Sequence, residues 1–176
     1  MPDDPGPILH LADAPVDEGA HGEHFAYSMS ELASASDGRA IGANVTRVPP
    51  GKAAFPLHHH YANEEHFFVL SGRGMLRVGE RTYPVKPHDY VVHPPGGPET
   101  AHQLVNNGHE DLVYLAFSTR VLPDVVGYPD SNKTGVRTGA GEEPAARFLV
   151  ADHVKGKLEY WDGEDGSQVS QVLAKP

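Results

Sequence analysis

Residues 58–72 read HHHYANEEHFFVLSG and combine a histidine cluster, two carboxylates and an apolar run that ends in glycine. Side chains alternate between the two faces of a strand, so His58 and His60 project to one side while His59 points away. A short turn followed by an antiparallel strand would bring Glu65 back beside the two histidines. The stretch therefore predicts most of a metal site on a pair of β-strands.

Glu64 is the competing carboxylate, because a turn tighter by one residue would bring it into the place of Glu65. We favour Glu65, since Phe67 and Val69 then follow it on the inward face of the strand. The other histidines near the site and on neighbouring strands are interpreted as surface, loop or rim residues: His59, His66, His88, His93 and His109.

The composition indicates an all-β protein. The chain of 176 residues contains 19 glycines and 16 prolines, which suits short strands joined by frequent turns. The candidate strands are residues 24–30, 41–48, 53–60, 64–70, 73–78, 81–85, 89–93, 101–106 and 111–118. Gly79 and Glu80 fit a tight hairpin turn, so we expect consecutive strands to pair antiparallel. This pattern predicts a barrel or a sandwich.

We divide the chain into an arm, a barrel domain and an extension. Residues 1–22 are rich in Asp, Pro, Gly and Ala and are interpreted as an irregular arm that is poorly ordered or follows the surface. Residues 23–120 hold the strand candidates and form the expected barrel. The strand pattern weakens beyond Arg120, and we expect residues 121–176 to form a short irregular extension that packs on the barrel.

Charge and cysteine content limit the function. A formal net charge of -10 argues against nucleic acid and anionic membrane surfaces, which favours a small molecule or a protein as the partner. The N-terminus lacks a basic region followed by an apolar one, and no apolar run approaches the ~20 residues that span a bilayer, so we expect a soluble, cytoplasmic protein. The chain has no cysteine, which leaves imidazole and carboxylate as its strong metal ligands.

A further histidine follows a rigid turn of proline and glycine at residues 94–98. His102, Leu104 and Asn106 share one face by alternation, so His102 points inward if Leu104 belongs to the core. A neutral imidazole inside a barrel needs a polar partner. Asn106, at the end of the strand, is interpreted as a turn-capping residue.

The histidines and Glu65 of residues 58–72, with a glycine on either side, resemble in their order the first motif of the cupin superfamily, G-x5-H-x-H-x3,4-E-x6-G. The motif is matched by Gly51, His58, His60, Glu65 and Gly72, with six residues in place of five before His58. The six residues between Glu65 and Gly72 agree with the motif.

The second cupin motif, G-x5-P-x-G-x2-H-x3-N, is matched less closely. Pro94, Gly96, His102 and Asn106 follow its order, with His88 in the first glycine position and His102 three residues late. Residues 41–118 carry the resemblance, which implies a double-stranded β-helix, the jelly-roll-like cupin barrel. The wider chain is similar to a bacterial group of single-domain cupins that remains functionally uncharacterised.

Residue pattern and resemblance together predict a mononuclear His3Glu centre formed by His58, His60, Glu65 and His102. The alternative is a purely structural polar cluster, which would have to hydrogen-bond three imidazoles and a carboxylate inside a barrel. We expect one divalent transition metal per chain. Iron or manganese is favoured, with nickel, zinc, cobalt and copper as alternatives, because all of them accept nitrogen and oxygen ligands.

Four protein ligands leave two positions for water or substrate on a six-coordinate ion. We therefore expect a small-molecule metalloenzyme, and first an oxidoreductase of the dioxygenase type. Metal-dependent isomerase, lyase or decarboxylase chemistry is the enzymatic alternative. A non-catalytic cupin that binds or senses a small ligand is the alternative from another class, followed by a metal-free cupin in a carbohydrate or surface-interaction role.

We also expect a homodimer. Single-domain cupins commonly pair through an edge strand or swap an N-terminal strand. The candidate strand at residues 25–29 is the edge that we expect to pair, since exposed sheet edges invite pairing.

Overall fold

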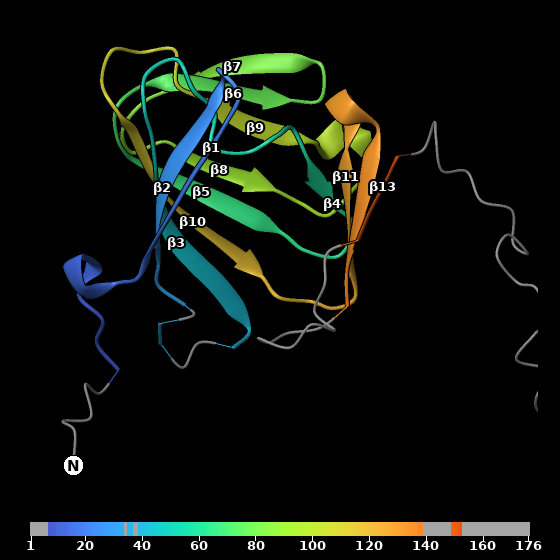
Figure 1. Cartoon of the computed structure of the whole chain (residues 1–176), viewed down its shortest axis with the longest axis horizontal. Coiled ribbons are helices and arrows are strands. Elements are labelled where there is room, and N and C mark those ends of the chain that lie inside the picture. The colour runs from blue at the N-terminus through green and yellow to red at the C-terminus, as the bar shows by residue number, and fades with distance from the viewer. Residues whose placement is uncertain (1–6, 34, 37–38, 139–148, 153–176) are drawn as a thin grey trace, which may run out of the picture.

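Short strands form a β-barrel (Figure 1). The computed structural model describes residues 7–33, 35–36, 39–138 and 149–152. The barrel strands are β1 Val16–His21, β2 Phe25–Glu31, β3 Ile41–Val48, β5 Glu65–Ser71, β6 Gly74–Val78, β7 Arg81–Val85, β8 Tyr90–His93, β9 His102–Val105 and β10 Leu112–Thr119. One side of the barrel is a six-stranded sheet in the order β1–β2–β3–β10–β5–β8, and the other is a three-stranded sheet in the order β7–β6–β9.

A further sheet, here called the cap sheet, stands across one end of the barrel, at the right in Figure 1. Its strands are β4 His59–His60, β11 Asp124–Tyr128, β12 Lys133–Arg137 and β13 Leu149–Asp152, in the order β13–β12–β11–β4. Because β4 lies between barrel strands in the chain, its pairing with β11 attaches the cap sheet to the barrel. The described residues also contain three 3-10 turns: η1 Leu11–Asp13, η2 Pro98–Thr100 and η3 Pro129–Ser131.

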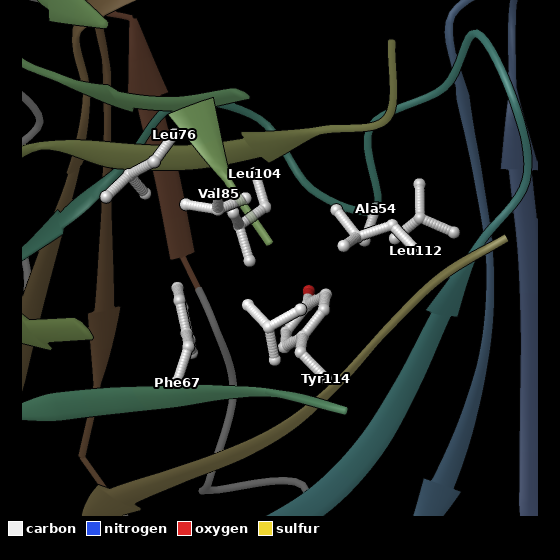
Figure 2. Close-up of a cluster of buried hydrophobic side chains, with 9 residues drawn as sticks. Ala54, Phe67, Leu76, Val85, Leu104, Leu112 and Tyr114 are labelled. Carbon is white, nitrogen blue, oxygen red and sulfur yellow. The ribbon is translucent and has the colours of Figure 1, made fainter. Parts of the chain in front are cut away.

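The core lies between the two sides of the barrel. Phe67 and Tyr114 point inward from the larger sheet and meet Leu76, Val85 and Leu104 from the smaller one, as Figure 2 shows. All five side chains are buried. Full burial of a side chain of this size contributes about 1.5–3 kcal/mol relative to exposure, so the core holds the strands that carry the candidate site.

Asn106 closes the turn that follows β9. Its Nδ2 donates to the carbonyl oxygens of Val48 and Glu110, both at 2.8 Å, and its Oδ1 accepts from the backbone N–H of Gly108 at 2.9 Å. The interpretation of Asn106 as a turn-capping residue is confirmed.

The all-β class and the double-stranded β-helix are confirmed, and the strands at 41–48 and 81–85 have the predicted bounds. The predicted strand at 53–60 is the main difference within the barrel. Only residues 59–60 form a strand, while Ala53 and His58 make isolated bridges. Pro56 has no N–H for a strand ladder, which explains the interruption.

The structure differs from the expected irregular arm at residues 16–21, which form β1 and pair antiparallel with β2. All but one of the residues of β1 are exposed. The segment therefore lacks the alternation of buried and exposed positions from which a strand is predicted. The expected domain boundaries at residues 22 and 120 stay a prediction.

The predicted pairing edge is wrong. The strand expected at residues 25–29 lies within β2, which is covered by β1 on one side and β3 on the other. The ends of the six-stranded sheet are β1 and β8. The homodimer itself stays a prediction.

The extension after Arg120 is also more regular than expected, since β11, β12 and β13 belong to it. The rest of the extension, at residues 139–148 and 153–176, lies outside the described residues. In the part that the structure describes, no helix has the length and hydropathy needed to cross a membrane. The cytoplasmic location stays a prediction.

Candidate metal centre

Backbone pairing brings the predicted ligands together at the end of the barrel that the cap sheet covers. His58 and His102 form an antiparallel bridge, in which each backbone N–H donates to the carbonyl of the other at 3.2 and 2.8 Å. His60 follows on β4, and Glu65 begins β5 after a short turn. The four residues therefore come from three neighbouring segments, as alternation and antiparallel pairing predict.

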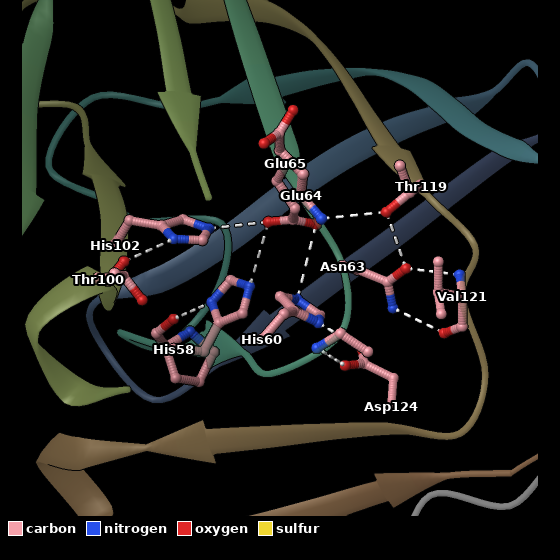
Figure 3. Close-up of polar contacts among 12 residues, drawn as sticks. His58, His60, Asn63, Glu64, Glu65, Thr100, His102, Thr119, Val121 and Asp124 are labelled. Atoms are coloured by element: carbon pink, nitrogen blue, oxygen red, sulfur yellow. Dashed lines mark hydrogen bonds and ion pairs between the residues drawn. The ribbon is translucent and has the colours of Figure 1, made fainter. Parts of the chain in front are cut away.

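The carboxylate of Glu65 lies at the centre of the cluster (Figure 3). Its Oε2 is 2.8 Å from Nε2 of His102 and 3.6 Å from Nε2 of His58. Its Oε1 is 3.7 Å from Nε2 of His60. Ligand atoms of His58, His60 and Glu65 all lie within 4.8 Å of one another, which is a spacing that one ion can bridge.

Glu64, the alternative carboxylate, faces away from this cluster. Its Oε1 accepts from Nε2 of His66 at 2.8 Å, and its backbone N–H donates to Oγ1 of Thr119 at 3.0 Å. Adjacent residues of an extended segment project to opposite sides, so only one of the two carboxylates can reach the three histidines. The structure brings Glu65 to them.

The chemistry of the donor set fits a cation. Nδ1 of each imidazole faces an oxygen: Pro56 O at 2.9 Å for His58, Asp124 Oδ2 at 2.6 Å for His60 and Thr100 O at 3.3 Å for His102. These oxygens can only accept, so a neutral ring with its proton on Nδ1 satisfies them and leaves the Nε2 lone pair free to bind an ion. Three lone pairs and a carboxylate repel one another unless positive charge lies among them. Imidazole and carboxylate ligands of this kind suit a divalent transition metal.

Without an ion, protonation supplies part of this charge. Burial disfavours the ionised form of Glu65, but hydrogen bonds from His102 and His58 outweigh burial and hold the pKa of the carboxyl well below its usual value. Burial also opposes the charge on His58, yet the contact with Glu65 raises the pKa of that imidazole. Burial lowers the pKa of His102. Of His58 and His102, His58 therefore holds a proton more readily next to Glu65.

The cluster opens to the outside of the barrel. The side chains of His58, His60 and Glu65 are 16, 18 and 20% exposed, so a small molecule can reach them. On the inner side, His58 and His102 line a small cavity of about 20 Å³ together with mostly apolar residues that include Phe67. A cavity of this size holds about one water molecule. A substrate must therefore approach from the solvent side.

His59 does not lie on the surface, in contrast to the sequence interpretation. It is 3% exposed, its Nδ1–H donates to the carbonyl of Gly96 at 2.8 Å, and its ring packs on Gly127 of β11. A Cβ atom at position 127 would lie 2.1 Å from Nε2 of His59. The burial of His59 comes from the cap sheet, which the sequence did not predict.

His93 is buried as well, so its interpretation as a rim residue is wrong. Its ring stacks on His102 with centroids 3.8 Å apart, and it pairs with Glu65 in the register of β5 and β8. Burial and the charge of His102 lower the pKa of His93 to about 3, so the ring is neutral. Its buried Nε2 has no hydrogen-bond partner among the described residues. Strand pairing with Glu65 is the signal that could have identified it.

Sequence reasoning also missed Asp124. This carboxylate belongs to β11, is 1% exposed and contacts His60. In the sequence, Asp124 is marked only as a single acid beside the apolar residues Val125 and Val126. The contact with His60 cannot be predicted from this pattern, because the two residues are 64 positions apart.

Residues 44–118 match the family model described as the cupin domain. Residues 44–118 are therefore a cupin domain, as the two motifs predict, and all four residues of the candidate centre lie within this matched part.

Known proteins are similar to this chain over different lengths. An uncharacterized protein of Methanocaldococcus jannaschii is 35% identical over 71 residues, which are 40% of this chain and 54% of that protein. The chain thus spans about half the length of this curated relative.

Two solved structures match most of the chain. One is a candidate sugar phosphate isomerase of Acidithiobacillus ferrooxidans, with 25% identity, a TM-score of 0.72 and coverage of 86% of this chain and 96% of that one. The other is a sugar phosphate isomerase of the cupin superfamily from Silicibacter pomeroyi, with 22% identity, a TM-score of 0.73 and coverage of 88% and 98%. The second likeness shows the fold alone.

Proposed function

We propose that this cupin is a metal-dependent isomerase of a small sugar phosphate, with its ion held by His58, His60, Glu65 and His102. The observation that carries the proposal is the convergence of three imidazole Nε2 atoms on one partly exposed carboxylate at the capped end of the barrel. The likeness to the Acidithiobacillus ferrooxidans protein supports the isomerase class, because it extends over 86% of this chain.

A divalent ion held by His58, His60, Glu65 and His102 would polarise a substrate carbonyl and lower the pKa of a bound hydroxyl, which is the assistance that an aldose–ketose isomerisation needs. We expect one ion per chain, with iron or manganese favoured over nickel, zinc, cobalt and copper. Glu65 contributes the one negative charge of the ligand set, so the ion keeps a net positive charge toward the substrate.

Tyr128 forms a wall beside the proposed substrate position. Its ring stacks near that of His58, with centroids 6.2 Å apart. Burial, followed by the charges of Asp124 and Glu65, raises the pKa of Tyr128 to about 12. The phenol therefore stays protonated at neutral pH and serves the site as a neutral polar group rather than as a base.

A phosphate group needs a local cation, since the chain as a whole carries a formal charge of -10. Lys133 is a candidate on the cap sheet, with Nζ 5.6 Å from the centre of the Tyr128 ring. Arg77 donates to Asp130 and Gln103 and is already engaged. We therefore assign Lys133 to the phosphate and expect Lys133→Gln to raise KM about tenfold, while Lys86→Gln, at a distant turn, leaves it unchanged.

The test uses the full chain loaded with manganese or iron(II). Pentose and hexose phosphates are incubated with the protein in D2O and followed by proton NMR. We expect aldose–ketose interconversion with deuterium entering at the carbon next to the carbonyl. Absence of turnover and exchange across the panel, with protein shown to contain one ion per chain, would contradict the proposal.

The dioxygenase expected from the sequence stays a prediction. Oxygen uptake with dihydroxyaromatic and diketone compounds separates it from the isomerase, because isomerisation consumes no oxygen. Saturable binding of sugar phosphates without turnover or oxygen uptake would instead support the alternative of a binding or sensing cupin.

A further inference from the structure

Asp124 joins the cap sheet to the candidate metal centre. Its Oδ2 lies 2.6 Å from Nδ1 of His60, and its Oδ1 accepts from the backbone N–H of Ala62 at 3.1 Å (Figure 3). The carboxylate is 1% exposed, so both contacts are shielded from water. Asp124 lies outside residues 44–118, the part that matches the cupin domain.

His60 differs from the other two imidazoles in the kind of acceptor that faces its Nδ1. His58 and His102 each face a backbone carbonyl two residues earlier in the chain, those of Pro56 and Thr100. A backbone carbonyl persists when side chains change. The tautomer of His60 alone depends on a side chain, and that side chain comes from the cap sheet.

We propose that Asp124 is a positioning residue, which fixes His60 in the tautomer with the proton on Nδ1 and the Nε2 lone pair toward Glu65. The inference rests on the proposed function, since this lone pair matters only if an ion is bound. It makes β11 a component of the metal centre rather than a covering strand. Outer partners of this kind orient metal-bound histidines and raise their basicity.

The position of Asp124 is set by several backbone contacts of β11. Val126 and Gly127 pair with His60 and His59, and the backbone N–H of Tyr61 donates to the carbonyl of Val125 at 3.0 Å. Close packing of His59 on Gly127 fixes the approach of the two strands. A group held in this way presents its oxygen to His60 without rearrangement.

Asp124→Asn tests the role with little change in shape. The Ala62 N–H can only donate, so it retains the amide oxygen and leaves the amide NH2 facing Nδ1 of His60. Nδ1 must then accept, and the proton moves to Nε2, where it blocks the ligand position. We expect the affinity of the full-length protein for Co²⁺ to fall about 10–100-fold by calorimetric titration, with a changed visible spectrum of the cobalt form.

Asp130→Asn is the matched control. Asp130 follows β11 in the 3-10 turn η3, is 52% exposed and pairs with Arg77 rather than with a histidine. We expect cobalt affinity and spectrum to equal those of the wild type. Equal affinity of Asp124→Asn and the wild type would overturn the inference, whereas a wild type that binds no metal would overturn the proposed function.

A second measurement needs no variant. Long-range ¹H–¹⁵N spectra of the metal-free wild type distinguish the two neutral tautomers of each histidine. We expect His60 in the Nδ1–H form. An Nε2–H form of His60 would overturn the inference, even if the Asp124→Asn protein does not fold.

Discussion

Glu64 and Glu65 are neighbours with the same side chain, yet they belong to two different polar clusters on opposite sides of the strand. Glu65 lies among His58, His60 and His102 at the capped end of the barrel and is 20% exposed. Glu64 is 42% exposed and pairs with a single histidine, His66, on the other side of the strand.

The two clusters differ in hydrogen-bond balance. On the outer side, His66 donates from Nε2 to Glu64, and the hydroxyl of Tyr90 donates to Nδ1 of His66 at 2.5 Å, so each donor meets an acceptor. In the inner cluster, each imidazole faces an oxygen with Nδ1 and Glu65 with Nε2, so a neutral ring has one N–H for two acceptors. The comparison shows what distinguishes the candidate metal centre. Hydrogen-bond acceptors outnumber N–H donors there, and this excess, rather than the number of histidines, indicates a place for a cation.

The largest expected difference in metal affinity is between two single variants, in each of which one of the two carboxylates is replaced by an amide. Glu65→Gln removes the anionic ligand, so metal affinity should fall by more than the roughly 100-fold that loss of an outer partner costs. Glu64→Gln is the matched control and should bind metal as the wild type does. Calorimetric titration of both metal-free variants measures the effect. Similar affinities would break the distinction between the two clusters.

Gly127→Ala tests whether the inner cluster depends on close packing of the cap sheet. The added Cβ would lie 2.1 Å from Nε2 of His59, and overpacking of this kind costs about 1–3 kcal/mol of unfolding free energy. Chemical denaturation measures the loss. His59→Ala in the same chain removes the clash, so the double variant should lose less than the sum of the two single changes. Additive losses would contradict a direct contact.

Metal binding should release protons in a pH-dependent way. The contact with Glu65 raises the pKa of His58, so the metal-free ring is protonated below that pKa and must lose its proton when an ion binds. Affinity therefore rises with pH until the pH exceeds the raised pKa. Calorimetry in buffers of different ionisation enthalpy should show about one proton released per ion at pH 6 and fewer at pH 9. Release that does not change with pH would speak against His58.

The outer cluster, formed by Glu64, His66 and Tyr90, should contribute little to stability or to metal binding. His66→Ala and Tyr90→Phe each remove part of an exposed chain of hydrogen bonds, and exposed pairs of this type contribute about 0–1 kcal/mol to stability. We expect small changes in denaturation midpoint and no change in metal content. Loss of the bound metal in either variant would show that the outer cluster supports the inner one.

The sequence predicted what depends on alternation. The strands near 41–48 and 81–85 and the inward direction of His58, His60 and His102 follow from a period of two, which local sequence reports directly. Antiparallel pairing then placed Glu65 beside them.

The remaining features depend on contacts between distant segments. β1 has exposed side chains along most of its length, so its pairing with β2 leaves no apolar pattern. The burial of His59 and the contact of Asp124 with His60 require β11 to lie on β4, a pairing across more than sixty positions. A pattern among neighbouring residues cannot predict a contact between segments so far apart in the sequence.

Elemental analysis of the full chain, purified without a histidine tag from cells supplied with all the candidate metals, tests the central claim most directly. The balance of donors and acceptors around Glu65 predicts one divalent transition metal ion per chain. A protein that contains no stoichiometric metal, and that takes up none when the ions are titrated into it, would contradict the account.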